Sequence, residues 1–295
     1  MKFAAITLLS TILLATACSS DFEPGSRVTK LRLLAVAADA PYALAEETVT
    51  LTPLLAAPDS VPVSWAYATC TDPRASTIDA CLAQLDEPFE LFDPERRALS
   101  LQLKSADAYA HSGFVGVVIV ACPGVLSEGA TEHVPITCRS LAGEVLGLGQ
   151  FEVGMKRIFV RGSDRNPNPS ITVVSWDGEA WPEAEIKQAE ACDKHDGDIS
   201  ECPSGLSHHL GFVTSAPDQG RDEHGQDFHE QQVVQVYATH GAFEYEVRVA
   251  EAADNAWVAQ RRSDSGAPDD IATLWFVVRD DRGGVGWQRR QVRVR

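Results

Sequence analysis

Two stretches in the second half of the chain carry the residue types that bind metal ions. Residues 193–198 read DKHDGD, and residues 222–230 read DEHGQDFHE. Carboxylate oxygens are the ligands that Ca²⁺ prefers, and Zn²⁺ accepts imidazole nitrogens together with carboxylates. The candidate ligands are Asp193, His195, Asp196, Asp198, His224 and His229. The segment 193–230 is therefore a candidate site for calcium or zinc, and an exported metal-dependent enzyme would carry its chemistry there.

The spacing of these residues also fits solvated loops that bind no metal. The first stretch lacks the Asp-x-Asp-x-Asp-Gly order of a calcium loop and has no Glu at the bidentate position. His224 and His229 are five residues apart, which places them on neither one face of a helix nor one face of a strand. Asp and Gly are also residues that turns select. We therefore predict no cofactor, and calcium or zinc stays open as the alternative.

Seven cysteines are the other reactive residues, and six of them form three close couples. The couples are Cys70 with Cys81, Cys122 with Cys138, and Cys192 with Cys202. Six cysteines allow about 15 pairings, of which local pairing within each couple is the simplest. An even set suits an oxidising compartment, and each short closed loop would contribute roughly 3 kcal/mol. The sequence has no Cys-x-x-Cys pair, which argues against zinc held by cysteines.

The seventh cysteine, Cys18, follows a segment with the order of a secretory signal. Lys2 precedes an apolar run over residues 3–14, and the small residues 15–17 come next. These are the charged, apolar and cleavage regions of a signal peptide. The apolar run is too short to cross a bilayer of about 30 Å as a permanent helix. The sequence therefore predicts a signal peptide over residues 1–17.

The residues Leu14-Ala15-Thr16-Ala17-Cys18 resemble the lipobox of bacterial lipoproteins. This resemblance implies that the Cys18 thiol carries diacylglycerol and that cleavage makes Cys18 the first residue of the mature chain. The commonest lipobox has leucine where this chain has Ala15. An ordinary signal peptide with a chance cysteine is the alternative. By resemblance to known lipoproteins, Ser19 favours sorting to the outer membrane, so the expected location is the cell envelope.

Charge limits the partners of the mature chain. The full sequence has a formal net charge of −17, and loss of Lys2 with the signal makes the mature chain −18. Such an acidic surface repels phosphate backbones, so we predict no nucleic-acid partner. Charge alone would not hold the chain on anionic lipid either. Attachment to a membrane would depend on the acyl chains.

Short alternating segments predict antiparallel strands through the first half of the chain. After a polar tether over residues 18–28, strand patterns occupy 30–38, 48–56, 61–70, 98–104, 113–122 and 147–160. Alternation predicts that most of these strands are half-buried, whereas the apolar run 113–122 suits the centre of a sheet. Ser76 and Asp79 form a possible capping box for a short helix that carries Cys81.

The second half begins with a new block of strands after a proline-rich junction. The residues Asn166-Pro167-Asn168-Pro169 cannot lie in a central strand. Strand patterns follow at 170–176, 208–216, 231–241, 242–251, 271–280 and 284–294, with the turn DRGG before the last. Pro182 and the residues after it predict a helix over 181–192. The polar face of Gln291, Arg293 and Arg295 predicts that the last strand lies at a sheet edge.

Two blocks of short strands without a βαβ rhythm predict an all-β chain with two antiparallel β-sandwiches in series. The last hairpin, 274–294, resembles that of PKD and related immunoglobulin-like modules. Residues 47–70 resemble their early strands, with Trp65 in the place of a core tryptophan. The PKD signature is matched only by Trp176-Asp177-Gly178, so the resemblance implies a fold class and no functional residue.

These observations predict a signal peptide (1–17), a lipidated tether (18–28) and immunoglobulin/PKD-like sandwiches over 29–158 and 166–295, with short helical insertions and local disulfides. The Gly-x-Ser-x-Gly, Ser-x-x-Lys, His-Glu-x-x-His and P-loop signatures are missing from the sequence. We expect a non-enzymatic surface protein, anchored to the membrane by its acyl chains, that binds a protein or glycan or acts as a spacer. The metal-dependent enzyme remains the alternative.

Overall fold

The computed structural model describes most of the chain after residue 24. The described residues are 25–57, 62–72, 74, 77–92, 98–131, 134–147, 149–192, 199–261 and 270–295. The predicted signal peptide, Cys18 and the candidate ligands Asp193, His195, Asp196 and Asp198 lie outside these ranges. Within them the fold is all-β and sandwich-like, and no helix has both the length and the apolar character to cross a membrane.

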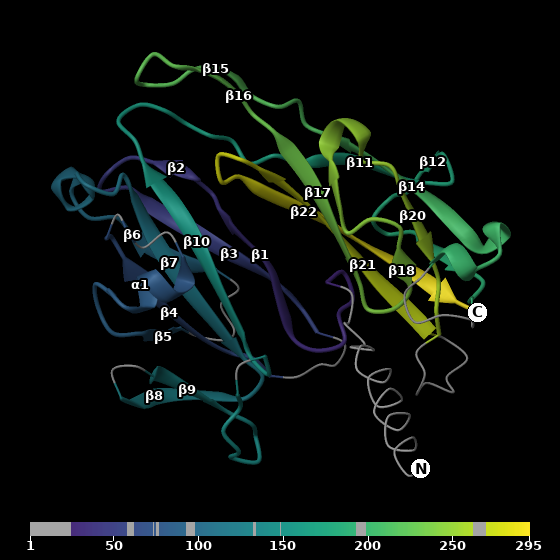
Figure 1. The fold of residues 1–295 in the computed structure, drawn as a ribbon, viewed down its shortest axis with the longest axis horizontal. Coiled ribbons are helices and arrows are strands. Elements are labelled where there is room, and N and C mark those ends of the chain that lie inside the picture. Colours follow the sequence, from purple (N-terminus) through teal and green to yellow (C-terminus); the bar gives the residue numbers. More distant parts are fainter. Residues whose placement is uncertain are drawn as a thin grey trace, which may run out of the picture.

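The first half of the described chain, residues 25–160, forms two sheets and a separate hairpin (Figure 1). The smaller sheet has the order β1 (Arg32–Ala38), β3 (Thr48–Ala56), β6 (Leu99–Gln102). The larger has the order β2 (Tyr42–Ala43), β10 (Glu152–Val160), β7 (Phe114–Cys122), β4 (Ser64–Cys70), β5 (Glu90–Phe92). The hairpin consists of β8 (Val125–Thr131) and β9 (Val134–Arg139), and the helical segments are α1 (Ile78–Leu82) and η1 (Ala106–Tyr109).

An apolar core fills the space between these two sheets. Every residue of β7 is buried, as the continuous apolar run predicted, and β7 is the middle strand of its sheet. Its side chains Val117 and Ile119 meet Leu51 of β3 and Ile158 of β10. Burying one such aliphatic side chain is worth about 1.5–3 kcal/mol, so this core is the main source of stability in the first half.

The second half, residues 161–295, repeats the two-sheet arrangement. One sheet has the order β12 (Glu179–Ala180), β11 (Ile171–Trp176), β14 (Ser207–Thr214), β20 (Asn255–Val258), β18 (Ala242–Phe243). The other has the order β13 (Ile186–Ala189), β22 (Val285–Val294), β21 (Asp270–Asp280), β17 (Gln232–Ala238), β19 (Val247–Val249). The hairpin β15 (Gln219–Arg221) and β16 (Asp227–His229) and the 3₁₀ helices η2 (Ile199–Glu201), η3 (Ser204–Leu206) and η4 (Ala250–Ala252) complete it.

Aromatic side chains dominate the core of the second half. Trp181, Trp257 and Phe276 are almost completely buried there, and the ring of Trp181 lies 6.5 Å from that of Phe276 at a steep angle. Edge-to-face pairs of this kind add about 0.5–1.5 kcal/mol to the gain from burial. Leu274, Phe276 and Val278 share one face of β21, as the alternation predicted.

The sheet of β1, β3 and β6 is covered on both faces at β1 and at the end of β3. One face meets the larger sheet of its own half, and the other packs on the sheet that contains β21. Leu34 contacts Trp275, and Ala35 contacts Val277. The half-buried strand predicted for residues 30–38 was therefore wrong, because a bulge between Leu33 and Ala35 turns apolar residues toward the second half as well.

The beginning of the described chain also reaches the second half. The Val28 N–H donates to the carbonyl of Ala238 in β17, and the Ala238 N–H donates to the carbonyl of Ser26. The Ser26 N–H in turn donates to the Glu246 carboxylate. Residues that precede the first strand of the first half are therefore fixed against the second half.

Three local predictions from the sequence were wrong. Residues 181–192 hold the strand β13 and no helix, because Ile186–Ala189 pair with β22 and that pairing outweighs helix propensity. The pairing of β13 with β22 makes β22 an inner strand, so the prediction that β22 lies at a sheet edge was wrong. The pairing of β13 with β22 is parallel, as is that of β2 with β10. The prediction of purely antiparallel sheets was therefore wrong.

The three predicted disulfides are confirmed. Cys70 bonds to Cys81, Cys122 to Cys138, and Cys192 to Cys202. The predicted helix around Cys81 is also confirmed as α1. Its N-cap is Thr77, whose side chain accepts from the Ala80 N–H, and Ser76, which the sequence predicted as the capping residue, lies outside the described residues. Each bridge closes a short loop within its own half of the chain.

Because the halves are in contact, we expect a substitution in the second half to change amide exchange in the first. Trp275→Ala should cost about 3–5 kcal/mol and raise the amide exchange rates of β1, because Trp275 packs against Leu34 there. Leu274→Ala is the matched control: its side chain faces the opposite core, so it should raise exchange in β14 and spare β1. Hydrogen–deuterium exchange would measure both, and unchanged β1 exchange in Trp275→Ala would contradict the packing described.

Candidate functional site

The histidines that suggested a metal site lie on the hairpin β15–β16. His224 is exposed in its turn, with Nε2 3.9 Å from Glu223 Oε1, and His229 Nδ1 lies 3.2 Å from the carbonyl oxygen of Glu230. Within the described ranges, no three His, Cys, Asp or Glu side chains gather closely enough to hold a metal ion. His224 thus lies in the turn and His229 at the end of β16, and the four other candidate ligands fall in 193–198, outside the described residues.

The same hairpin binds the segment that connects the two halves. Glu223 Oε2 accepts hydrogen bonds from the N–H groups of Gly162 at 2.8 Å and Ser163 at 3.2 Å, and the Glu223 N–H donates to Asp164. Desolvation acts to raise the pKa of Glu223, but the two N–H donors and the nearby Arg161 outweigh it and lower that pKa below its ordinary value. The carboxylate is therefore held in its charged form against the connector.

An arginine stacks between aromatic rings from both halves. The Arg282 guanidinium lies 4.8 Å from the ring centre of Tyr42 in β2 and 3.9 Å from that of Phe228 in β16. Its Nη1 also lies 3.2 Å from Asp218 Oδ2. Cation–π contacts are worth about 0.5–2 kcal/mol each, depending on burial. This arrangement joins the turn between β21 and β22 to the first half and to the hairpin at once.

A second arginine extends the stack on the first half. The Arg161 guanidinium lies 5.1 Å from the ring centre of Tyr42 and 5.2 Å from that of Phe159. The two rings meet edge to face at 5.4 Å. We call the set Tyr42, Phe159, Arg161, Glu223, Phe228 and Arg282 the junction clamp. Sequence reasoning missed it, since its members lie far apart in the chain.

Beside the junction clamp, a buried lysine crosses between the halves. Lys156 of β10 is only 6% exposed, and its Nζ donates to the carbonyl of Gly283 in the β21–β22 turn. Burial, together with the positive charge of Arg279, lowers the pKa of Lys156 to about 8, although Asp280 opposes the shift. Desolvation likewise raises the pKa of Asp280. The two halves are thus joined by a buried polar contact, and removing its charged groups from water costs free energy.

The connector itself bonds to both halves through one side chain. Asn168 Nδ2 donates to the carbonyl of Ala38 in β1 at 2.7 Å, and its Oδ1 accepts from the Val285 N–H of β22 at 2.9 Å. The Asn-Pro-Asn-Pro segment, predicted as a junction, is therefore a bonded bridge. Its prolines fix φ, which restricts the connector further.

His208 and His209 serve the β11–β12 turn. This turn has positive φ at Asp177 and Gly178, which is the geometry of a two-residue hairpin connection. Asp177 Oδ2 lies 2.9 Å from His208 Nδ1, and Asp177 Oδ1 accepts from the His209 N–H. The His208 ring stacks on Trp176 at 4.3 Å. These contacts fix a turn to the neighbouring strand β14.

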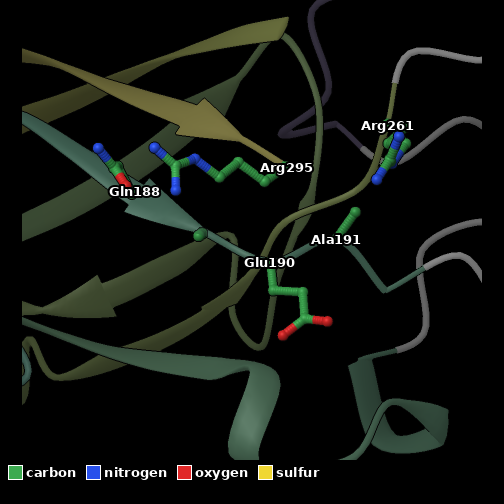
Figure 2. A pocket seen from close by; sticks show the side chains of 6 residues that line it. Gln188, Glu190, Ala191, Arg261 and Arg295 are labelled. Carbon is green, nitrogen blue, oxygen red and sulfur yellow. The ribbon is translucent and has the colours of Figure 1, made fainter. Parts of the chain in front are cut away.

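A hollow of about 420 Å³ lies beside the end of β22. Its lining consists of Gln188, Ala189, Glu190, Ala191, Arg261 and Arg295. Figure 2 shows Arg295 extending toward Gln188, whereas Glu190 points away and Arg261 lies on the other side. The polar groups do not converge on one point, and both charge signs are present, so the hollow has no evident ligand class.

No protein-family model matches the sequence, and no curated protein is detectably similar to it. Among solved structures, the chain is similar to the dimeric latent PorU of Porphyromonas gingivalis, with a TM-score of 0.20 and 8% identity. That match covers 91% of this chain but only 24% of the PorU chain. A likeness of this degree assigns neither a family nor a function.

The buried lysine predicts a pH-dependent stability. Because the pKa of Lys156 falls from 10.5 to about 8 on folding, the unfolded chain binds more protons between these values. The free energy of unfolding should therefore rise with pH across this window, by up to roughly 3 kcal/mol from this group. Lys156→Met should lose that rise, while Lys104→Met, at an exposed lysine, should keep it. Urea melts at pH 7 to 10.5 would measure this, and parallel slopes for wild type and Lys156→Met would refute it.

The junction clamp predicts a local effect of removing Glu223. Glu223→Ala deprives the N–H groups of Gly162 and Ser163 of a charged acceptor, a bond type worth about 1.5–3 kcal/mol. Amide exchange at these two residues should accelerate by about tenfold or more. Glu251→Ala, at an exposed glutamate of η4, is the control and should leave both amides unchanged. Equal exchange in the two variants would show that the hairpin does not hold the connector.

Proposed function

We propose that this protein is a lipid-anchored, non-enzymatic component of the bacterial cell envelope. Its all-β body would bind a protein or a glycan, or act as a spacer. The observation that carries the proposal is the distribution of the cysteines. Six of the seven form disulfides within the described chain, and the seventh, Cys18, follows the signal-like segment in a lipobox-like sequence. A thiol acylated at that position accounts for the odd cysteine.

The disulfides support a location outside the cytoplasm. Bonds of this kind persist in oxidising compartments, which in bacteria include the periplasm and the cell surface. The net charge of −17 opposes binding to anionic lipid headgroups, so acyl chains are the better source of membrane attachment. Outer-membrane sorting, suggested by Ser19, is part of the same proposal.

The joint between the halves supports a presenting or spacing role. Two immunoglobulin/PKD-like units, over residues 29–158 and 166–295, would keep a fixed angle, since apolar contacts, the Asn168 bridge and the junction clamp all cross between them. A rigid body holds its exposed loops at a set distance from the membrane. Such loops would bind a protein or a glycan, as β-sandwich loops commonly do.

The anchor is tested by removing its thiol. Cys18→Ala should abolish metabolic labelling with palmitate and release the protein from the membrane fraction, because a signal peptide alone leaves no permanent anchor. Ser20→Ala, two residues away, is the matched control and should behave as wild type. If Cys18→Ala still sediments with membranes, or if wild type takes up no label, the proposed anchor is wrong.

A further inference from the structure

Three exposed apolar side chains lie on the β8–β9 hairpin and on the segment that follows it. Val125, Leu141 and Val145 are 55%, 69% and 59% exposed. We call these three residues the hairpin patch. Figure 1 shows β8 and β9 standing apart from the five-stranded sheet of the first half. Isolated exposed apolar residues are ordinary, but neighbouring ones mark contact surfaces.

The pairing of the strands places two members of the hairpin patch side by side. Val125 pairs with Arg139, and Arg139 pairs on its other side with Val145. Residues directly opposite each other in antiparallel strands point to the same face, so the two valines flank Arg139. Leu141 follows in the turn closed by the hydrogen bond from the Gly143 N–H to the Ser140 carbonyl.

The opposite face of the hairpin is tied to the body of the protein. Leu126 and Cys138 are buried against Phe151, and Cys138 is bonded to Cys122 at the end of β7. The hairpin patch is therefore held outward by packing and by a covalent bond. Collapse onto the core would require both to break.

The hairpin patch lies near the place where the chain enters the fold. Lys30 Nζ donates to the carbonyl of Gly149, a few residues after Val145, and the Leu33 N–H donates to the Glu152 carboxylate. Six residues lie between Cys18 and Gly25, and the seven Cα–Cα steps from one to the other span at most about 25 Å when fully extended. A lipid on Cys18 would hold this end of the molecule close to the bilayer.

From this placement we propose that the hairpin patch enters the interface of the bilayer and forms a second membrane contact beside the lipid. The occupant is a zwitterionic lipid surface: the hairpin patch is apolar except for the exposed Arg139 between its two valines, whose long side chain can reach headgroup level, and the net charge of −17 opposes anionic headgroups. A second copy of the chain is a poorer occupant, since the same net charge opposes association. This inference rests on the proposed anchor at Cys18.

Tryptophan fluorescence in vesicles tests the contact. Leu141→Trp places a probe in the hairpin patch, and Val213→Trp places one at a valine of equal exposure to Val125, 55%, on the outer sheet of the second half. Each variant is studied as the lipidated full chain in phosphatidylcholine vesicles that contain nitroxide-labelled lipid. A parallel arm replaces residues 1–18 with a hexahistidine tag bound to nickel-chelating lipid, which supplies an anchor independent of lipidation. The wild-type chain gives the background of its native tryptophans.

Quenching of the Leu141→Trp probe should exceed that of the Val213→Trp probe by about threefold in both arms, with a blue shift on vesicle binding. Equal quenching of the two probes in vesicle-bound protein overturns the inference. If the full chain carries no lipid while the tagged arm shows the difference, the proposed function fails and the membrane contact stands. Loss of the difference in vesicles made with anionic phosphatidylglycerol is expected, and stronger quenching there would overturn the choice of lipid.

Discussion

The burial of β1 between the core of the first half and the β21 sheet of the second half is the constraint on which the rest of the structure depends. The sheet of β1, β3 and β6 supplies Val49 and Leu51 to the core of the first half and Leu34 and Ala35 to the contact with the second. Separating the halves would therefore expose apolar surface on both β1 and β21. At about 25 cal/mol per Å² of apolar area, even a few hundred Å² outweigh the gain in freedom of a short connector.

Polar groups at the junction fix the position of the two halves relative to each other. Apolar surfaces alone tolerate sliding, whereas the Lys156 bond to Gly283 and the two bonds of Asn168 require fixed positions. Burying the lysine costs free energy, as its lowered pKa shows. The stack of Tyr42, Arg282 and Phe228 then restrains the side of the junction covered by the β15–β16 hairpin. The cost of desolvation is offset by the apolar contact next to it.

The sequence predicted correctly those features that depend on residues close together in the chain. The apolar run of β7, the β21–β22 hairpin and the three disulfides between nearby cysteines all followed from spacing alone. The strand β13 and the second buried face of β1 did not, because each depends on a partner that is far away in the chain. The junction clamp was missed for the same reason: Glu223 was visible only as part of a histidine-rich loop.

The three disulfides fix segments that lie outside the main strands of the sheets. Cys70–Cys81 ties α1 to β4, Cys122–Cys138 ties the β8–β9 hairpin to β7, and Cys192–Cys202 closes the loop after β13. None of the three crosses the junction between the halves. Their sequence separations are 11, 16 and 10 residues, and loops of this size give roughly 3 kcal/mol each by restricting the unfolded chain. Covalent bonds therefore fix the insertions locally, while packing and the junction clamp fix the body, so loss of a disulfide would loosen one insertion without releasing the halves from each other.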